Sequence, residues 1–260
     1  MYKQIARYYD LIHAQLTADL PLIQAIAQQT GGPIVELGCG TGRLLRPLAQ
    51  AGYQLTGIDN SAEMLTHCRH ALTVTEQAQV TLLQGDMLAL EEVLAANQGQ
   101  FALAVIAYNT LMHFSLPQVG QILRQLRPFL QPDGQLFVDI TNPFVLAETA
   151  VVPQLTLENQ LTDPQNGDHI LQFAQTHHDE NEQICHVNWI FDTSPAAGGA
   201  VQRHLSQMTY HYYYPHELEL IIQASGYRLR QLWGNYDQTP FTEESERLLL
   251  LIGHNNVHMP

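Results

Sequence analysis

The segment Ile34-Val35-Glu36-Leu37-Gly38-Cys39-Gly40-Thr41-Gly42 carries the strongest structural signal in this chain. Its first four residues predict a short buried strand, and a helical pattern with Leu44, Leu45 and Leu48 follows the glycines. Glycines at such a strand-to-helix junction allow a tight turn and let the backbone approach a ligand closely. The segment therefore predicts a strand, loop and helix unit that holds a ligand at its loop.

Strand and helix patterns alternate on both sides of this segment. A helical pattern occupies residues 1–30, and further strand patterns lie at residues 53–59, 80–84, 101–107 and 135–140, with helical patterns between them. Another helix is expected after Pro215, followed by strands at 227–233 and 247–253. This alternation is typical of a parallel sheet with helices on both faces. We therefore predict an α/β fold with a doubly wound, mostly parallel seven-stranded sheet.

The pattern changes near residue 145. Short alternating runs extend from there to residue 214 and are separated by Asn166-Gly167, Glu180-Asn181 and Gly198-Gly199. Such runs are typical of an antiparallel β-meander. We therefore predict an N-terminal lid helix and a ligand-binding α/β core in residues 1–144. Residues 145–214 are expected to form an antiparallel insertion that caps the active site, and residues 215–260 to complete the core.

Two acidic residues follow neighbouring strands of the predicted sheet. Asp59 ends the strand at 53–59, and Asp86 follows the strand at 80–84. Open α/β sheets bind ligands at the carboxyl ends of their strands, where a carboxylate can accept hydrogen bonds from ribose hydroxyls. Taken singly, Asp59 could cap a helix and Asp86 could belong to a turn. Together with the glycine loop, they predict a ligand that contains a nucleoside.

The spacing of the glycines separates two classes of such ligand. The loop has the pattern Gly-x-Gly-x-Gly, whereas a dinucleotide pyrophosphate is typically bound by Gly-x-Gly-x-x-Gly. S-adenosylmethionine has no phosphate. Its ribose hydroxyls suit carboxylate oxygens, its adenine amino group suits a hydrogen-bond acceptor, and its methionine carboxylate suits backbone amides. The spacing favours S-adenosylmethionine, and an NAD(P)-dependent oxidoreductase is the alternative.

With these motifs the chain resembles the class I S-adenosylmethionine-dependent methyltransferases, of the small-molecule type with a β insertion (glycine/sarcosine N-methyltransferase-like). The matching motifs are Val35–Gly42, Gly57–Ser61, Gln84–Met87 and Leu126–Gly134, and the resemblance covers about residues 1–145 and 215–255. It implies a Rossmann-like methyltransferase fold. It also implies a cofactor site made of Tyr9, Gly38, Cys39, Gly40, Gly42, Asp59, Asn60, Met64, Gly85, Asp86, Met87, Tyr108 and Asn109.

In methyltransferases similar to this chain, the loop after the fourth strand, here residues 108–114, lies beside the transferring methyl group. We predict that His113 orients the acceptor or takes its proton; the alternative is a structural histidine at a helix start. A general base would matter for an alcohol or acid acceptor and little for a neutral amine. The candidate acceptor contacts are Tyr8, His113, Asn142, Arg203, Tyr210 and Tyr212.

Plainer interpretations exist for several of these candidates. Tyr8 and Tyr9 lie on a helix expected to cover the cofactor, but their rings could instead pack that helix onto the sheet. Arg203 could bind an acceptor carboxylate or simply be solvated. Alternation places Tyr210 and Tyr212 on one face of a strand at 203–214, and that face either packs inward or lines the acceptor pocket.

Composition argues against several other functions. The 260 residues include 11 Lys and Arg against 25 Asp and Glu, and this net charge of −14 disfavours nucleic acid and anionic membranes as partners. We find no signal peptide and no run of about 18 apolar residues. The three cysteines are odd in number and lie far apart, which argues against a disulfide framework and a cysteine-based zinc site. We therefore expect a cytoplasmic monomer or homodimer without a metal.

The preferred function is methyl transfer from S-adenosylmethionine to a nitrogen or oxygen of a small-molecule acceptor, by in-line displacement in a closed site. A non-catalytic S-adenosylmethionine-binding regulatory protein could carry the same glycine loop, and it remains the second alternative. The sequence names no particular acceptor.

Overall fold

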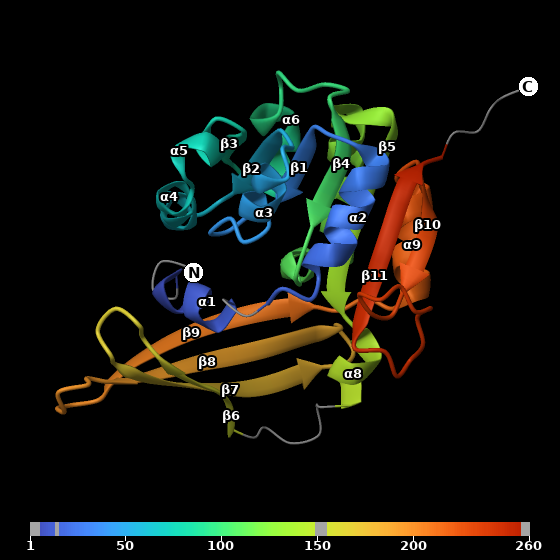
Figure 1. Ribbon diagram of the computed structural model, residues 1–260. Helices are drawn as coiled ribbons and strands as arrows, with labels where there is room; N and C mark the ends of the chain where they lie inside the picture. The colour runs from blue at the N-terminus through green and yellow to red at the C-terminus, as the bar shows by residue number, and fades with distance from the viewer. Residues whose placement is uncertain (1–5, 14–15, 149–154, 256–260) are drawn as a thin grey trace, which may run out of the picture. The chain divides into compact units, whose positions relative to one another are not determined.

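The computed structural model describes residues 6–13, 16–148 and 155–255 (Figure 1). The chain forms two compact units. The α/β unit consists of residues 18–145 and 213–260, and the β unit consists of residues 1–17 and 146–212. Each unit contains its own sheet, with seven strands in the α/β unit and four in the β unit among the described residues.

The sheet of the α/β unit has the strand order β10-β11-β5-β4-β1-β2-β3. Its strands are β1 (Ile34–Leu37), β2 (Leu55–Asp59), β3 (Val80–Gln84), β4 (Phe101–Ile106), β5 (Leu130–Thr141), β10 (Tyr227–Trp233) and β11 (Arg247–His254). The neighbouring pairs β5–β4, β4–β1, β1–β2 and β2–β3 are parallel, whereas β11 runs antiparallel to both β5 and β10. The predicted doubly wound, mostly parallel sheet is confirmed.

Helices connect these strands. They are α2 (Leu20–Thr30), α3 (Leu45–Gln50), α4 (Ala62–Ala71), α5 (Val74–Gln77), α6 (Leu90–Val93), α7 (Leu116–Leu126) and α9 (Pro215–Ala224), and α8 (Pro143–Glu148) spans the boundary between the units in sequence. Three short 3-10 helices follow β3, β4 and α7, namely η2 (Met87–Ala89), η3 (Thr110–His113) and η4 (Arg127–Phe129). Figure 1 shows α2 lying across β4 and β5.

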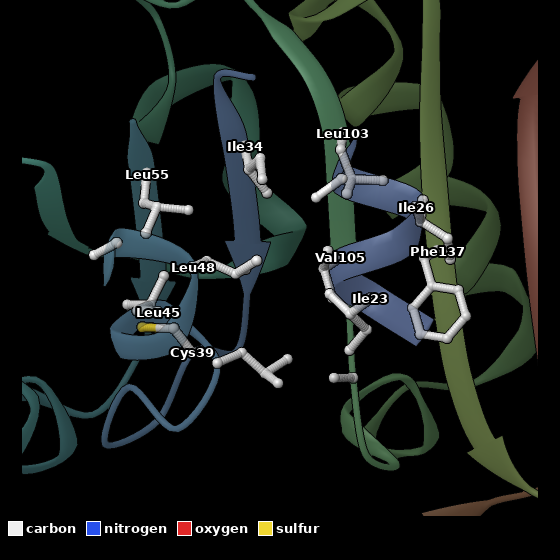
Figure 2. Packing of buried hydrophobic residues seen from close by; sticks show 14 of the residues in the cluster. Ile23, Ile26, Ile34, Cys39, Leu45, Leu48, Leu55, Leu103, Val105 and Phe137 are labelled. Carbon is white, nitrogen blue, oxygen red and sulfur yellow. The ribbon is translucent and has the colours of Figure 1, made fainter. Parts of the chain in front are cut away.

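The main core lies between the sheet and the helices on one of its faces. Ile23 and Ile26 of α2 belong to one buried cluster with Val105 of β4 and Phe137 of β5, and Figure 2 shows these side chains together. Every residue of β4 is buried, as expected for a central parallel strand covered on both faces. This packing fixes the carboxyl ends of the central strands, where the site residues follow.

The start of β5 differs from the prediction. The strand was expected at residues 135–140, but it begins at Leu130, so Pro132-Asp133-Gly134 lies inside it. The pairing of β5 with β4 shifts in register opposite these residues. A Cβ at Gly134 would lie 2.9 Å from the carbonyl oxygen of Phe101, so glycine makes this irregularity possible.

The β unit confirms the predicted antiparallel insertion. Its strands are β6 (Leu155–Thr162), β7 (His169–Asp179), β8 (Ile184–Ser194) and β9 (Gln202–His211), and they pair antiparallel in chain order. The helix α1 (Ala6–His13), which was predicted as an N-terminal lid helix, groups with this unit. The reason is Tyr8, which packs in a cluster with Ile170, Phe191 and Met208.

The strand expected at 203–214 is shorter in the structure. It ends at His211, because Tyr214 is the N-cap of α9 and Pro215 begins that helix. Tyr210 is therefore a strand residue, while Tyr212 follows the strand. The predicted strand face shared by Tyr210 and Tyr212 is therefore not formed.

Candidate active site

The glycine loop between β1 and α3 is built from backbone conformations that favour glycine. Gly38, Gly40 and Gly42 have φ angles of 76°, 54° and 85°. A Cβ at Gly38 would lie 2.3 Å from Cγ2 of Thr110, and one at Gly42 would lie 2.5 Å from Sγ of Cys68. The loop is thus packed closely against the residues that follow β4 and against α4, and side chains at these positions would displace it.

Asp59, at the end of β2, connects the glycine loop to the start of α4. Its Oδ2 accepts a hydrogen bond of 2.9 Å from the backbone N–H of Gly40, and its Oδ1 accepts one of 2.8 Å from the N–H of Ser61. Burial raises the pKa of this carboxyl, while the N–H groups of Ser61 and Gly40 lower it. The predicted neighbours Asn60 and Met64 lie just after it, with Asn60 exposed and Met64 buried.

The motif after β3 is joined to the same edge of the sheet. The backbone N–H of Gly85 donates to the carbonyl oxygen of Asp59 over 3.0 Å. Asp86 is exposed and is the N-cap of η2, where its Oδ1 accepts a hydrogen bond from the N–H of Leu88. Met87 beside it is buried. The structure therefore brings Gly40, Asp59 and Gly85 together, with Asp86 and Met87 directly following.

The loop after β4 begins with two residues in the left-handed region. Tyr108 and Asn109 have φ angles of 46° and 67°, which non-glycine residues adopt rarely. Oδ1 of Asn109 accepts hydrogen bonds from the N–H of Thr141 (2.7 Å), the hydroxyl of Thr141 (3.0 Å) and Nη2 of Arg247 (3.1 Å). The side-chain oxygen of Asn109 thus contacts protein groups, and the cofactor contact expected of this residue stays a prediction.

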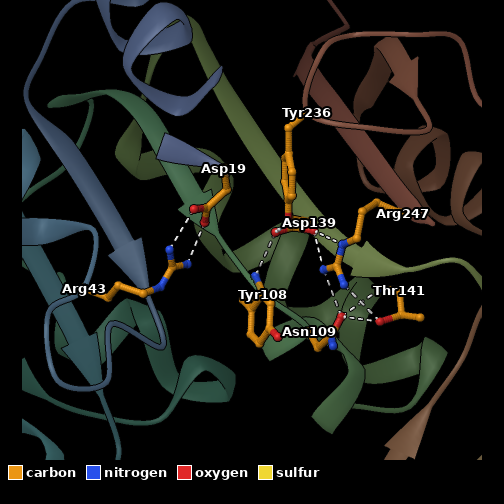
Figure 3. A network of polar contacts seen from close by, with 8 residues as sticks. All are labelled: Asp19, Arg43, Tyr108, Asn109, Asp139, Thr141, Tyr236 and Arg247. Atoms are coloured by element: carbon orange, nitrogen blue, oxygen red, sulfur yellow. Dashed lines mark hydrogen bonds and ion pairs between the residues drawn. The ribbon is translucent and has the colours of Figure 1, made fainter. Parts of the chain in front are cut away.

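A buried ion pair, Asp139 with Arg247, contacts this loop (Figure 3). Asp139 on β5 is 0% exposed, and Nε of Arg247 on β11 lies 2.9 Å from its Oδ1, with Nη2 bonded to the same oxygen. Oδ2 of Asp139 accepts hydrogen bonds from the hydroxyl of Tyr236 (2.9 Å) and from the N–H of Tyr108 (3.3 Å). Burial lowers the pKa of Arg247, but the carboxylate of Asp139 contributes to a net rise.

The ring of Tyr108 lies between two guanidinium groups (Figure 3). The guanidinium carbon of Arg247 is 5.4 Å from the ring centroid, and that of Arg43 is 5.8 Å from it. Arg43 follows the glycine loop directly, and both of its terminal nitrogens bond to the carboxylate of Asp19 at 2.7 and 2.6 Å. Tyr108 therefore contacts one cation from each side of the site.

Glu36, in β1 just before the glycine loop, is a buried carboxyl that could bind a cationic group of a ligand. It is 5% exposed, and its Oε2 is a buried atom without a hydrogen-bond partner among the described residues. Burial raises the pKa of this carboxyl to about 8, and Arg43 lowers it. A buried carboxyl with an unpaired oxygen beside a glycine loop suits the amino group of S-adenosylmethionine.

His113 ends η3, and a tyrosine anchors this helix on both sides of the histidine. The hydroxyl of the buried Tyr213 donates to the carbonyl oxygen of Leu111 over 2.9 Å and also bonds to that of Phe114. His113 itself is half-buried. The η3 segment is thus held at a defined position in the α/β unit, although the catalytic role of His113 stays a prediction.

Five candidate residues lie in the β unit, where the structure gives each a protein partner. The ring of Tyr8 stacks on Phe191 with centroids 4.6 Å apart, and its hydroxyl lies 3.0 Å from that of Thr193. Tyr9 stacks on His13. The hydroxyl of Tyr210 donates to the sulfur of Met208.

Arg203, on β9, forms a two-point ion pair with Asp192 on the neighbouring strand. The Nε–Oδ1 and Nη2–Oδ2 distances are 2.7 and 2.6 Å, and the Arg203 side chain is 60% exposed. Tyr212, the remaining candidate of the β unit, is buried, and its N–H donates to the carbonyl oxygen of Gln183. Their acceptor contacts stay predictions.

Asn142 has a structural function in the α/β unit. It is fully buried, and its Nδ2 lies within hydrogen-bond distance of the carbonyl oxygens of Thr242, Glu243 and Ser245. Its Oδ1 accepts from the N–H of Phe144. The side chain therefore fixes the loop before β11 to the start of α8.

The sequence analysis did not select four charged residues of this region: Glu36, Arg43, Asp139 and Arg247. Two of them did leave a signal, because Glu36 lies in the apolar strand β1 and Asp139 lies in the buried apolar run of residues 136–140 in β5. Charged residues in such positions are rarely buried without a partner or a function. Arg247, the partner of Asp139, is 108 residues away in sequence, so this pair was not predictable.

Two further properties concern the described residues only. They contain no group of three or more His, Cys, Asp or Glu side chains arranged to hold a metal ion. None of the helices within them has both the length and the apolar character needed to cross a bilayer.

Comparison with known proteins identifies methyltransferase relatives of this chain. Residues 34–134 match a family model described as a methyltransferase domain. YqeM, a methyltransferase homologue of Bacillus subtilis (strain 168), is 27% identical over 252 residues, which is 95% of each chain. The ubiquinone biosynthesis O-methyltransferase of Xanthomonas axonopodis is 30% identical over 132 residues, and the match spans about half of each protein, 50% of this chain and 52% of that enzyme.

Solved structures show the same fold. An S-adenosylmethionine-dependent methyltransferase from Clostridium acetobutylicum superposes with a TM-score of 0.78 at 16% identity, covering 97% of this chain and 98% of that one. CalS10, an amino pentose methyltransferase from Micromonospora echinaspora, gives a TM-score of 0.70 at 14% identity, covering 95% and 96%. The chain therefore contains a methyltransferase domain at residues 34–134, and in its motifs and fold it is similar to the class I S-adenosylmethionine-dependent methyltransferases.

Proposed function

We propose that this enzyme methylates a nitrogen or oxygen of a small-molecule acceptor in the α/β unit, at the carboxyl ends of β1, β2 and β4. The proposal rests on the contacts that join the glycine loop, the end of β2 and the loop after β4. The glycine loop bonds to Asp59 through Gly40 and packs against Thr110 through Gly38. A donor held by the glycine loop and Asp59 would thus lie beside the loop that carries His113.

The proposed donor-binding groups follow from the resemblance to the class I methyltransferases, and the geometry of these segments supports them. S-adenosylmethionine supplies an electrophilic methyl group bound to a sulfonium sulfur. The backbone of Gly38–Gly42 would bind its methionine portion, with the unpaired Oε2 of Glu36 as the acceptor for its ammonium group. Asp59 would accept hydrogen bonds from the ribose, and Asp86 with Met87 would contact the adenine.

His113 would act on the acceptor. A neutral amine already carries a free lone pair, so the protein mainly has to orient it and exclude water. A hydroxyl or carboxylic acid must lose its proton, and a positioned base typically accelerates such a step about 10²–10⁴-fold. His113 therefore determines the rate mainly for oxygen acceptors.

Similar proteins are named for O-methylation and for an amino sugar acceptor. The matched ubiquinone enzyme is named as an O-methyltransferase, and CalS10 is named as an amino pentose methyltransferase. The net charge of −14 disfavours nucleic acid as the acceptor. We therefore place a small amine, amino sugar or phenol ahead of a macromolecule.

The test is a transfer assay with labelled S-adenosylmethionine. The purified full chain is incubated with separate panels of small amines, amino sugars and phenols, and methylated products are identified by mass spectrometry. Transfer to a member of one panel would support the proposal and identify the acceptor class. Tight S-adenosylhomocysteine binding without transfer to any panel would favour a non-catalytic binding protein, and NAD binding without S-adenosylhomocysteine binding would favour an oxidoreductase.

A further inference from the structure

The ion pair of Asp139 and Arg247 requires an explanation beyond stability. Asp139 is 0% exposed and the Arg247 side chain is 12% exposed, so both charges have lost most of their hydration. Replacing such a pair by apolar residues is often neutral or stabilising, because desolvation offsets the attraction between the charges. A buried pair is therefore weak evidence for a stabilising function, and its contacts indicate what else it does.

Those contacts converge on two backbone positions. Asp139 accepts from the N–H of Tyr108 through Oδ2 and from the N–H of Asn109 through its carbonyl oxygen, over 3.3 and 2.9 Å. Arg247 donates to Oδ1 of Asn109 over 3.1 Å, and its guanidinium group lies over the ring of Tyr108. The pair thus contacts the two consecutive residues with positive φ, and these contacts offset an unfavourable backbone conformation.

The same two residues determine where η3 begins. Thr110 follows them directly, and it is the residue whose Cγ2 lies closest to the position of a Cβ at Gly38. On its other side, the Tyr108 ring contacts Arg43, which follows the glycine loop. A change in the backbone of Tyr108 and Asn109 would therefore move the glycine loop and η3 relative to each other.

We propose that Arg247, held by Asp139, is a positioning residue that sets the loop of residues 108–113 against the glycine loop in the conformation that binds the methyl donor. This inference rests on the proposed function in one respect, namely that the two loops border the donor. Arg247 acts through Tyr108 and Asn109, and no contact of Arg247 with the donor or acceptor is part of the proposal.

The chemistry of the side chain explains why it is arginine. Its Nε and Nη2 bond to Asp139, its Nη1 donates to Oγ1 of Thr141 over 3.1 Å, and its Nη2 also reaches Asn109. Lysine has one compact ammonium group and cannot reproduce this planar set of donors. Arg247→Lys should therefore keep the buried charge paired but lose the contacts that fix the loop.

The experiment compares three variants of the full chain. Arg247→Lys tests the geometry of the donors, and the double variant Asp139→Asn with Arg247→Gln removes both charges so that neither is left buried and unpaired. Arg228→Gln removes an exposed arginine from the neighbouring strand β10 and serves as the control. The affinity for S-adenosylhomocysteine is measured by calorimetry, and amide hydrogen exchange is followed along the chain.

We expect about tenfold or greater loss of S-adenosylhomocysteine affinity in Arg247→Lys and in the double variant, and less than twofold in Arg228→Gln. Exchange should accelerate at residues 107–114 while β4 stays protected, which a merely structural contribution to stability would not produce. The proposal is overturned if a folded Arg247→Lys or double variant keeps its affinity within twofold, or if exchange accelerates uniformly. Failure of the wild-type chain to bind S-adenosylhomocysteine would instead overturn the donor assignment, and this proposal with it.

Discussion

The carboxylate of Asp59 accepts the backbone N–H of Gly40 at 2.9 Å, so the glycine loop is tied to the end of β2 by the residue that is assigned to the donor ribose. The second oxygen holds the N–H of Ser61 at the start of α4. One side chain therefore shapes the loop and is also the proposed ligand. Its substitution should affect donor binding and stability together.

Asp59→Ala should weaken S-adenosylhomocysteine binding about 10- to 100-fold and lower the free energy of unfolding by about 2 kcal/mol. The estimate follows from the typical net value of about 1.5–3 kcal/mol for a hydrogen bond to a charged group. Calorimetric titration and urea denaturation measure the two effects separately.

Ser61→Ala is the matched control for this variant. It removes the N-cap contact of Ser61 with the N–H of Met64, which should cost about 1 kcal/mol of stability. The donor affinity should stay within about twofold of wild type, because the Asp59 carboxylate is retained. An Asp59→Ala protein that is folded and binds the donor normally would contradict the assignment of Asp59.

Gly38→Ala should disrupt the contact between the two loops. The new Cβ would lie 2.3 Å from Cγ2 of Thr110, in a residue whose φ angle of 76° is already unfavourable for alanine. Overpacking and backbone strain together should cost about 2–4 kcal/mol of stability and reduce donor affinity at least about tenfold. Thermal denaturation and S-adenosylhomocysteine titration measure these effects.

Two companion variants separate strain from overpacking at Gly38. Gly52→Ala has a similar positive φ of 93° but no neighbouring atom within 4 Å, so it should show the strain cost alone, about 1 kcal/mol. Adding Thr110→Ser to Gly38→Ala removes the clashing methyl group and should recover part of the loss. Equal losses in Gly38→Ala and Gly52→Ala would show that the packing against Thr110 is unimportant.

The strands of the α/β unit were predictable because each leaves a local pattern. β4 is buried along its whole length and reads as a continuous apolar run, and β1 ends directly at the glycines. The start of β5 was not predictable in this way. Its bulge at Pro132-Asp133-Gly134 depends on a register shift against β4, and turn residues inside a strand look locally like a turn before it.

The candidate site was predictable only where its signal is local. The glycine loop and Asp59 lie within one βαβ unit, and the structure joins them by a hydrogen bond. Arg247 and Asn109 are separated by 138 residues, and their contact follows from the antiparallel pairing of β11 with β5. Asn142 was selected only because it is a polar residue at a strand end. Its three carbonyl partners follow it by about 100 residues and leave no local signal.

Glu36 should make the stability of the enzyme depend on pH. Burial raises the pKa of its carboxyl to about 8 in the folded protein, above its usual value near 4.5. Between these values the folded state binds more protons than the unfolded state, so the contribution of Glu36 to stability falls as pH rises. Glu36→Gln lacks this titration and should gain stability relative to wild type, by up to about 1.4 kcal/mol per pH unit.

Urea denaturation at several values between pH 5 and pH 8 measures this difference, and Glu76→Gln is the control. Its capping contact with Thr73 lowers the pKa of Glu76, so the stability that it provides is already complete above the unfolded pKa. The difference between wild type and Glu76→Gln should therefore be constant over this range. A constant difference for Glu36→Gln as well would mean that Glu36 is ionised in the folded protein throughout.

His113→Gln should distinguish the two acceptor chemistries. If the acceptor is a hydroxyl, loss of the base should lower kcat about 10²–10⁴-fold, whereas a neutral amine should lose less than about tenfold because it needs no deprotonation before attack. The affinity for S-adenosylhomocysteine should be unchanged within about twofold, because the carbonyls of Leu111 and Phe114 still hold η3 through Tyr213. Rates with an active amine and an active phenol, measured under saturating donor, give the comparison. An equal loss with both acceptors would assign His113 to positioning, since a proton-transfer role predicts that the loss depends on the acceptor.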